Sequence, residues 1–346
     1  MRALVLAGHG GLEQLAIRHD LPMPELDGPH AVRIRVEAVA LNRLDLFVLA
    51  GLPGSKLTPG WVPIADATGF VDAVGEAVTR VKVGDTVVLN PGISCRTCAY
   101  CLADQQPLCL KYQILGEHRS GTAAEFCVVP EWGLEVVSSA IPATVRAAFG
   151  LATLTAYRML VGKARVQAGE QVLIWGIGGG VALAALQLAK SRGARVWVTS
   201  GDVAKLERAK ALGADEVLNH TAENVPAVIR AATGKRGVDV VIDSVGSATW
   251  TRSLQSLGRG GRLVTCGGTS GPMVETDVRR LFMNQWTISG STMGSETEWA
   301  AVTAEFRAGG LRPPVDSVFP LQDAASAYAR LQSGLQFGKV VIAVAE

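Results

Sequence analysis

Four cysteines lie close together in the sequence, in the array Cys95-x-x-Cys98-x-x-Cys101-x7-Cys109. Four thiolates at this spacing can close a tetrahedral shell around one zinc ion and leave no coordination position for a substrate. The array therefore predicts one structural zinc, bound in a lobe over residues 92–112. Two disulfides are the alternative. The apolar stretch Met1–Leu6 is too short for a secretion signal, so we expect a cytoplasmic protein with reduced thiols.

A second group of residues could bind phosphate. The apolar stretch Val172–Trp175 runs into the string Gly176-Ile177-Gly178-Gly179-Gly180-Val181, which would open a helix. Glycines let the backbone approach a pyrophosphate, and a helix N-terminus offers free N–H groups and the positive end of the helix dipole. The context of strand, turn and helix predicts a dinucleotide site. The residues expected to contact the cofactor are Gly176, Gly179, Gly180 and Val181. A glycine-rich turn without a ligand is the alternative.

The end of the next expected strand should decide between the two nicotinamide cofactors. An acidic side chain there would bind the adenosine ribose and repel a 2′-phosphate. The sequence instead places Ser200 at this point, and Lys205 and His220 could reach a phosphate from the same rim. These residues favour NADPH over NADH. A boundary shifted by two residues would place Asp202 there and reverse the preference, and Lys205 could equally be a solvated residue on a helix.

The elements that must position these residues follow two patterns. Residues 1–142 contain short alternating runs such as Val32–Val36, separated by Gly and Pro, which indicates a mostly β domain. Over residues 143–294, strands alternate with helices, which indicates an α/β domain with a doubly wound parallel sheet. Residues 295–346 are expected to return to the first domain.

The bulk properties narrow the function classes. The chain has 346 residues, 48% of them hydrophobic and 18% charged, with a net charge of +2. We expect no nucleic-acid partner, because no basic excess exists, and no membrane partner, because no apolar run approaches about 18 residues. A last strand near Thr287–Gly290 would leave an open sheet edge, which favours a homodimer or homotetramer.

Several segments resemble the medium-chain dehydrogenase/reductase superfamily over nearly the whole chain. They include Gly75–Asp85, the cysteine array, Leu154–Tyr157 and Phe337–Val340. The resemblance implies a GroES-like catalytic domain, a Rossmann domain and a cofactor in the cleft between them. It also implies that Thr155 holds the carboxamide end of the cofactor, that Gly267 and Lys339 belong to the cofactor site, and that the cysteines form the family's structural zinc lobe.

The departures from the family pattern concern its catalytic zinc. Asn42 stands where the zinc alcohol dehydrogenases have a cysteine, Ala65 where they have a histidine, and Leu151 where they have the third ligand. These three residues cannot build an ordinary catalytic zinc site. Asn42 with Asp45 instead resembles the Asn-x-x-Asp of the quinone oxidoreductase branch, which reduces quinones and enones without metal.

We therefore expect NADPH-dependent reduction of a quinone or an α,β-unsaturated carbonyl. Asn42 would donate a hydrogen bond near the acceptor oxygen, Asp45 would orient it, and Arg43 could pair with the cofactor pyrophosphate. Alternatively, Asn42 and Asp45 are only caps of a turn and a helix, and Arg43 is a surface charge.

Two other functions stay open. One is an alcohol or aldehyde dehydrogenase with atypical ligands, in which His118 joins Asp66, Asp45 or Glu117 around a second metal. The other is a cofactor-binding protein without turnover.

Overall fold

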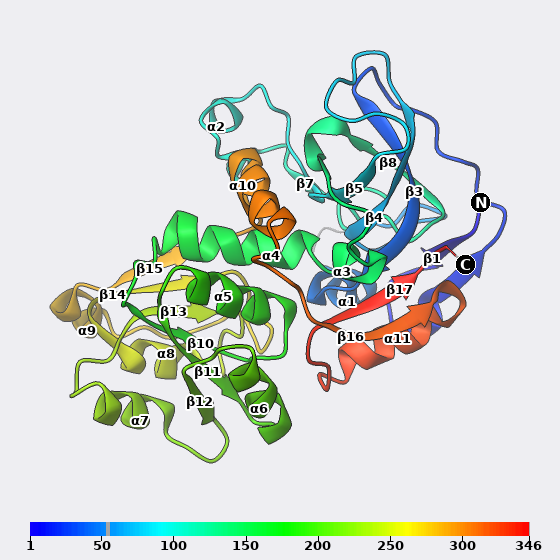
Figure 1. Ribbon diagram of the computed structural model, residues 1–346. Helices are drawn as coiled ribbons and strands as arrows, with labels where there is room; N and C mark the ends of the chain where they lie inside the picture. Colours follow the sequence, from blue (N-terminus) through cyan, green and yellow to red (C-terminus); the bar gives the residue numbers. More distant parts are fainter. Residues whose placement is uncertain (53–55, 346) are drawn as a thin grey trace. The chain divides into compact units, whose positions relative to one another are not determined.

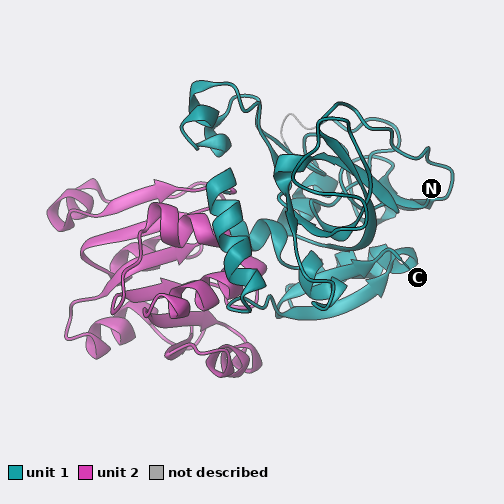
Figure 2. Ribbon diagram, turned by 45° about the horizontal axis from the view of Figure 1, so that its top comes forward, with its two compact units in different colours: residues 1–154, 294–346 teal, residues 155–293 magenta. Residues whose placement is uncertain are grey.

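The computed structural model describes residues 1–52 and 56–345, and the chain divides into two compact units (Figure 2). Unit 1 contains residues 1–154 and 294–346, and unit 2 contains residues 155–293. The expected α/β class, with one mostly β domain and one parallel-sheet domain, is confirmed. Each unit is described on its own below.

The centre of unit 1 is a seven-stranded sheet whose main path runs β16-β17-β3-β4-β5-β9, with β8 also paired to β3. Strand β3 is antiparallel to β4, β8 and β17, and its apolar residues Val32, Ile34 and Val36 alternate into the core as period two requires. The seven strands are β3 (Ala31–Ala40), β4 (Asp66–Val74), β5 (Thr86–Leu89), β8 (Phe126–Pro130), β9 (Leu134–Val136), β16 (Val315–Pro320) and β17 (Lys339–Ala343). Two further pairs are β1 (Ala3–Leu6) with β2 (Leu15–Arg18), and β6 (Gly92–Ile93) with β7 (Gln113–Ile114).

The packing of the helix at residues 143–147 explains why the first segment of unit 1 extends to residue 154. Ala143, Ala147 and Ala148 lie on or beside α3 and pack against Ala38 and Ala40 of β3. Small alanines allow this close approach, so residues 143–154 belong with unit 1 rather than with the domain expected to begin at 143. The helices are α1 (Arg43–Ala50), α2 (Ala99–Leu102), α3 (Ala143–Ala147), α10 (Glu296–Arg307) and α11 (Ala324–Gln332), with α4 (Gly150–Tyr157) running into unit 2.

Unit 2 contains a six-stranded, fully parallel sheet in the order β12-β11-β10-β13-β14-β15. Numbered along the chain this is 3-2-1-4-5-6, the strand order of the Rossmann fold. The strands are β10 (Gln171–Ile174), β11 (Arg195–Ser200), β12 (Glu216–Asn219), β13 (Val238–Asp243), β14 (Leu257–Thr265) and β15 (Thr287–Gly290).

Helices lie along both faces of this parallel sheet (Figure 1). One face buries Trp175 and Trp197 together with Ile229, Trp250 and Leu281, which come from α7, α8 and α9. The helices are α5 (Gly180–Ser191), α6 (Val203–Ala211), α7 (Val225–Ala232), α8 (Trp250–Ser256) and α9 (Val278–Asn284), and a π-helical segment (Arg158–Lys163) follows α4.

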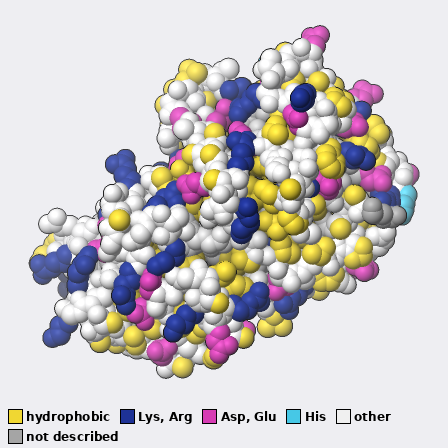
Figure 3. Space-filling view, in the orientation of Figure 1, with side chains coloured by type: hydrophobic (Ala, Val, Ile, Leu, Met, Phe, Trp, Pro, Cys, Tyr) yellow, Lys and Arg dark blue, Asp and Glu magenta, His cyan; other side chains and the backbone are white. Residues whose placement is uncertain are grey.

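Charge on the surface is mixed. Figure 3 shows Lys and Arg side chains interspersed with Asp and Glu over the face drawn, as a net charge of +2 suggests. Within the described residues, no helix has both the length and the apolar character needed to cross a membrane.

Candidate active site and zinc lobe

The four cysteines of the array come together in unit 1. The ligand atoms of Cys95, Cys98, Cys101 and Cys109 all lie within 4.8 Å of one another. The sulfurs of Cys98 and Cys101 are 3.5 Å apart and those of Cys95 and Cys101 are 3.9 Å apart. Tetrahedral zinc with Zn–S bonds of about 2.3 Å requires sulfur separations of about 3.8 Å, so the cluster fits the ion. These distances are far too long for disulfide bonds, and all six cysteines are free.

The lobe also contacts the beginning of α10. The guanidinium of Arg96 pairs with the Glu296 carboxylate at 3.1 Å and lies 4.6 Å from the centroid of the Trp132 ring. The hydroxyl of Ser295, the N-cap of α10, donates to Asp104 at 2.8 Å. Arg96 and Asp104 both have positive φ, 59° and 54°. The fold of the lobe therefore holds two residues in the left-handed region where they reach α10.

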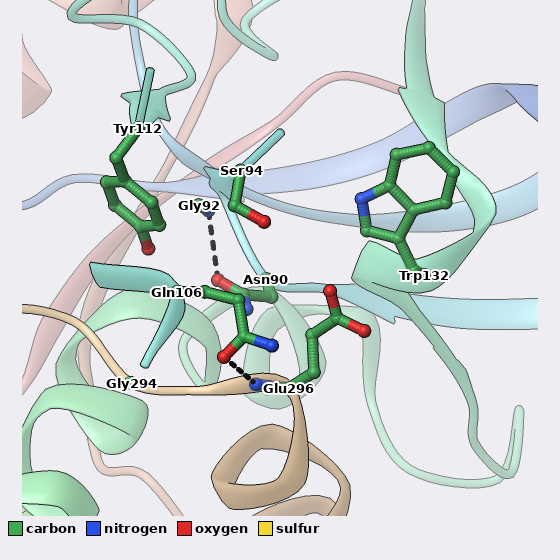
Figure 4. A pocket seen from close by; sticks show the side chains of 8 residues that line it. All are labelled: Asn90, Gly92, Ser94, Gln106, Tyr112, Trp132, Gly294 and Glu296. Atoms are coloured by element: carbon green, nitrogen blue, oxygen red, sulfur yellow. Dashed lines mark hydrogen bonds between the residues drawn. The ribbon is translucent and has the colours of Figure 1, made fainter. Parts of the chain in front are cut away.

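A small cavity of about 10 Å³, room for roughly one water molecule, lies where the lobe meets α10 (Figure 4). Gln106 accepts a hydrogen bond from the backbone N–H of Glu296 at 3.4 Å beside it. The indole N–H of Trp132 has no acceptor among the described residues. A water in this cavity would satisfy it, so we assign the cavity to structure rather than to a ligand.

A second polar cluster is buried in unit 1 around Asp66. The Lys339 ammonium donates to Asn42 Oδ1 at 2.5 Å and to Asp66 Oδ2 at 2.9 Å. The amide nitrogen of Asn42 donates to the same Asp66 oxygen at 2.9 Å, and the backbone N–H of Leu151 donates to Asp66 Oδ1 at 2.6 Å. The side chains of Lys339 and Asp66 are only 4% and 0% exposed. The sequence placed Lys339 with the cofactor, and the structure adds that its ammonium is bound to Asn42 and Asp66.

Asn42 and Asp45 form the capping box of α1. The backbone N–H of Asn42 donates to Asp45 Oδ2 at 2.6 Å. Both residues therefore cap the helix, as the alternative interpretation predicts. They also interact with the buried cluster, because Asn42 bonds to Asp66 and Asp45 lies in the field of Lys339 and Asp66. Burial raises the pKa of Asp45 to about 7, against the opposing effects of hydrogen bonds and of Lys339. The amide of Asn42 is largely engaged: its nitrogen donates to Asp66 and, weakly at 3.4 Å, to Ala40 O.

The positions that correspond to the three ligands of zinc alcohol dehydrogenases meet in this cluster. Asn42 and the backbone of Leu151 both bond to Asp66, the neighbour of Ala65. His118 Nδ1 accepts from the backbone N–H of Ile114 at 3.2 Å and lies 3.6 Å from the Glu117 carboxylate, so Glu117 is the one partner expected around a second metal that the structure places beside it. Among the described residues, only the four cysteines form a group of three or more side chains suited to metal.

The glycine string in unit 2 has the backbone that the sequence predicts. Gly176 and Gly178 have φ of 69° and 130°, conformations that L side chains rarely adopt. Gly179 is the N-cap of α5, so the helix begins at Gly180 and its first N–H groups stay free for an anion. Gly178 was absent from the predicted contacts. Its place inside the string, between Ile177 and Gly179, was the signal that could have identified it.

The end of β11 lies as predicted, with Ser200 as its last residue and buried. Asp202 instead caps α6, because its carboxylate accepts the N–H of Ala204 at 2.8 Å. His220 follows β12 and has a pKa below the usual value, chiefly because it is partly buried and also because Arg252 is near. Arg252 donates to His220 O at 3.1 Å. No pattern in the sequence indicated that Arg252 lies beside His220.

The other predicted cofactor residues are distributed over both units. Gly267 follows β14 and so lies at the carboxyl edge of the sheet with Gly176, Ser200 and His220. Lys205 and Val181 lie in the first turns of α6 and α5, and Thr155 is buried on α4. Arg43 is the first residue of α1, in unit 1.

Comparisons with known proteins agree with this architecture. Residues 28–139 match the family model of the alcohol dehydrogenase GroES-like domain, and residues 180–308 match that of the zinc-binding dehydrogenases. A quinone oxidoreductase of Lama guanicoe is 31% identical over 99% of this chain and 97% of its own. The quinone oxidoreductase of Homo sapiens is 29% identical over 96% and 94%.

Solved structures are similar over the whole chain. One described as an NAD-dependent alcohol dehydrogenase has a TM-score of 0.95 and 43% identity, and the match covers 100% of both chains. A cobalt- and zinc-bound thermostable alcohol dehydrogenase from Pyrobaculum aerophilum has a TM-score of 0.88 and 34% identity, with 99% of each chain covered.

Proposed function

The chain belongs to the medium-chain dehydrogenase/reductase superfamily of oxidoreductases, and we propose that it transfers hydride from NADPH to a quinone or an α,β-unsaturated carbonyl without a catalytic metal. The supporting observation is the composition of the Asp66 cluster. Asn42, Ala65 and Leu151 offer neither thiolate nor imidazole, and the polar atoms around them meet at the ammonium of Lys339. The ammonium engages the side-chain oxygens of Asn42 and Asp66 that a metal ion would otherwise need as ligands.

Reduction of a quinone or enone can proceed at a site without a metal. Alcohol oxidation forms an alkoxide, which needs a Lewis acid or an equivalent. A quinone or enone spreads the developing charge from the attacked carbon to its oxygen, so orientation and hydrogen-bond donors suffice. NADPH, when bound, supplies the hydride and leaves as NADP⁺, and a proton from water completes the reduced product. The second N–H of Asn42, which makes a weak 3.4 Å contact with Ala40 O, is our candidate for such a donor.

The residues of unit 2 fit the cofactor. The backbone at Gly176, Gly179, Gly180 and Val181 and the N-terminus of α5 would hold the pyrophosphate. Ser200 leaves room for a 2′-phosphate, which Lys205 and His220 would bind. Thr155 would hold the carboxamide end, and Gly267 is a further candidate in unit 2. Arg43 and Lys339 are candidates for cofactor binding from unit 1.

The zinc ion belongs, in this proposal, to the cysteine lobe, where it stabilises structure. Free cysteines and a thiolate metal site both suit a reducing compartment, which supports a cytoplasmic location.

We also propose that the enzyme forms a homodimer or homotetramer. Strand β15 is the last strand of its sheet and pairs only with β14 among the described strands. The helix before it, α9, exposes Val278, Phe282 and Met283 by 60–67%. An open strand edge beside apolar side chains favours pairing with a second copy.

One experiment separates this function from its rival. NADPH oxidation is measured with quinones, enones and aldehydes, and NAD⁺ or NADP⁺ reduction is measured with alcohols, while metal analysis counts zinc per chain. We expect quinone or enone turnover with one zinc. The relative described as an NAD-dependent alcohol dehydrogenase supports the alternative, an alcohol or aldehyde dehydrogenase. Alcohol turnover with two zinc ions per chain would establish that alternative, and tight NADPH binding without turnover would leave only a binding protein.

A further inference from the structure

We propose that Lys339 is a positioning residue of the reaction: its ammonium, buried between Asp66 and Asn42, fixes the orientation of the Asn42 amide and forms with Asp66 a fixed dipole beside it. The inference rests on the proposed function and assigns a task to a residue that the sequence placed only in cofactor binding. Its basis is the pair of contacts at 2.5 and 2.9 Å from Nζ.

The sheet of unit 1 explains why residues so distant in sequence meet. Strand β17 begins at Lys339, β3 ends two residues before Asn42, and β4 begins at Asp66. The three strands are neighbours and antiparallel where they pair: Ala40 lies opposite both Val341 of β17 and Asp66 of β4. Two strand beginnings and one strand end therefore share an edge, and their side chains gather there.

The energetics argue against a purely stabilising role for this ion pair. Removing an ammonium and a carboxylate from water costs several kcal/mol for each ion, and an apolar pair of similar volume is often as stable or more so. The Asp66 carboxylate is nevertheless fully buried and accepts three hydrogen bonds, from Lys339, Asn42 and the backbone of Leu151. When the hydrogen bonds of a buried polar cluster are all made, they hold its side chains in one arrangement.

The arrangement that it specifies concerns the amide of Asn42. An amide has two ends of similar shape, and an unconstrained one can rotate by half a turn. Here Lys339 can only donate, so it selects Oδ1, and the buried Asp66 carboxylate accepts from Nδ2. The oxygen end therefore faces Lys339 and the donor end faces Asp66 in every molecule. The Lys339–Asp66 pair is also an oriented dipole whose positive end contacts Asn42, and it is in place before the acceptor binds.

The test compares neutral pairs. The double variant D66N/K339M removes both buried charges together, so that neither is left unpaired. The control D215N/K190M removes both charges of a partly exposed Lys–Asp pair, 2.8 Å apart, in unit 2. We measure the thermal midpoint, the NADPH Kd, and kcat and KM for the quinone or enone that the wild type reduces. We expect the first double variant to fold and to bind NADPH within about threefold of wild type, with kcat lower by about 100-fold. The control pair should change neither value.

Several results would overturn the inference. Wild-type kcat in D66N/K339M would show that the pair only stabilises the fold. A weakened NADPH Kd with unchanged kcat at saturation would return Lys339 to the cofactor site. Should the double variant fail to fold, K339Q, which keeps a donor but no charge, answers the same question by its kcat. Failure of the proposed function is visible separately, because the wild type would then reduce no quinone or enone.

Discussion

The backbone N–H of Asp202 donates a hydrogen bond to the Oγ of Ser200 at 3.0 Å. This contact fixes which of the two residues ends β11 and which begins α6. Ser200 is the last residue of β11, the position that we propose governs cofactor choice, and the Asp202 carboxylate is occupied with the N-terminus of its helix. In this proposal, the side chain that meets the adenosine ribose is neutral.

A carboxylate at residue 200 should reverse the cofactor preference. In S200D, the new charge would repel a 2′-phosphate and accept from the ribose hydroxyls, so we expect kcat/KM for NADPH relative to NADH to fall by about 100-fold, or about 2.7 kcal/mol. The measurement is steady-state kinetics with both cofactors. D202N, which alters only a helix cap, should leave the ratio near wild type, and a similar fall in both variants would contradict the assignment.

The contacts between the cysteine lobe and the beginning of α10 should depend on bound zinc. We expect removal of zinc by a chelator to release Arg96 and Asp104 from α10, which hydrogen exchange would detect as faster exchange at residues 296–300. Unchanged exchange after verified zinc loss would contradict this coupling.

Arg96 itself offers a finer test of the lobe. R96A loses the contacts with Glu296 and Trp132 but keeps the left-handed backbone, whereas R96G loses the contacts and relieves the backbone. We expect R96G to exceed R96A by about 1 kcal/mol in the free energy of unfolding. Urea denaturation of both variants measures the difference, and equal stability would indicate that the left-handed conformation costs nothing.

Stability should fall with rising pH because of Asp45. Its pKa is about 7 in the folded protein and near 3.8 in the unfolded chain, so the folded state binds more protons between these values. The contribution is complete below about pH 4 and is lost as pH rises through 7. We expect the free energy of unfolding of wild type relative to D45N to fall by up to about 1.4 kcal/mol per pH unit across this window. Lys339, Asp66 and Tyr328 face the same carboxyl: Asp66 raises the pKa of Asp45 and Lys339 lowers it. A flat difference would show that Lys339 and the hydrogen bonds to Asp45 keep it ionised.

Oligomer formation should depend on α9. F282D places a charge among the exposed apolar side chains of the helix next to β15, and we expect it to lower the molar mass measured by light scattering. L335D is a suitable control, because Leu335 is similarly exposed but lies in unit 1. Equal masses for wild type and F282D would place the interface elsewhere.

Local patterns in the sequence sufficed for much of the fold. The cysteine spacing, the glycine string and the alternation of strands with helices depend on residues near one another, and they sufficed to predict the cysteine cluster and the parallel sheet. The role of Lys339 did not follow, because Asn42 lies 297 residues away and the contact depends on strand pairing. The position of Arg252 beside His220 and the alanine packing of α3 likewise arise only from tertiary contacts.

The place of β17 in the sheet has a consequence for biosynthesis. Asp66 is synthesised 273 residues before the lysine that neutralises it, and at ribosomal rates of about 5–20 residues per second this interval lasts tens of seconds. All of unit 2 emerges in between. Strands β16 and β17 belong to the sheet of unit 1, so this sheet is complete only after all of unit 2 has been made.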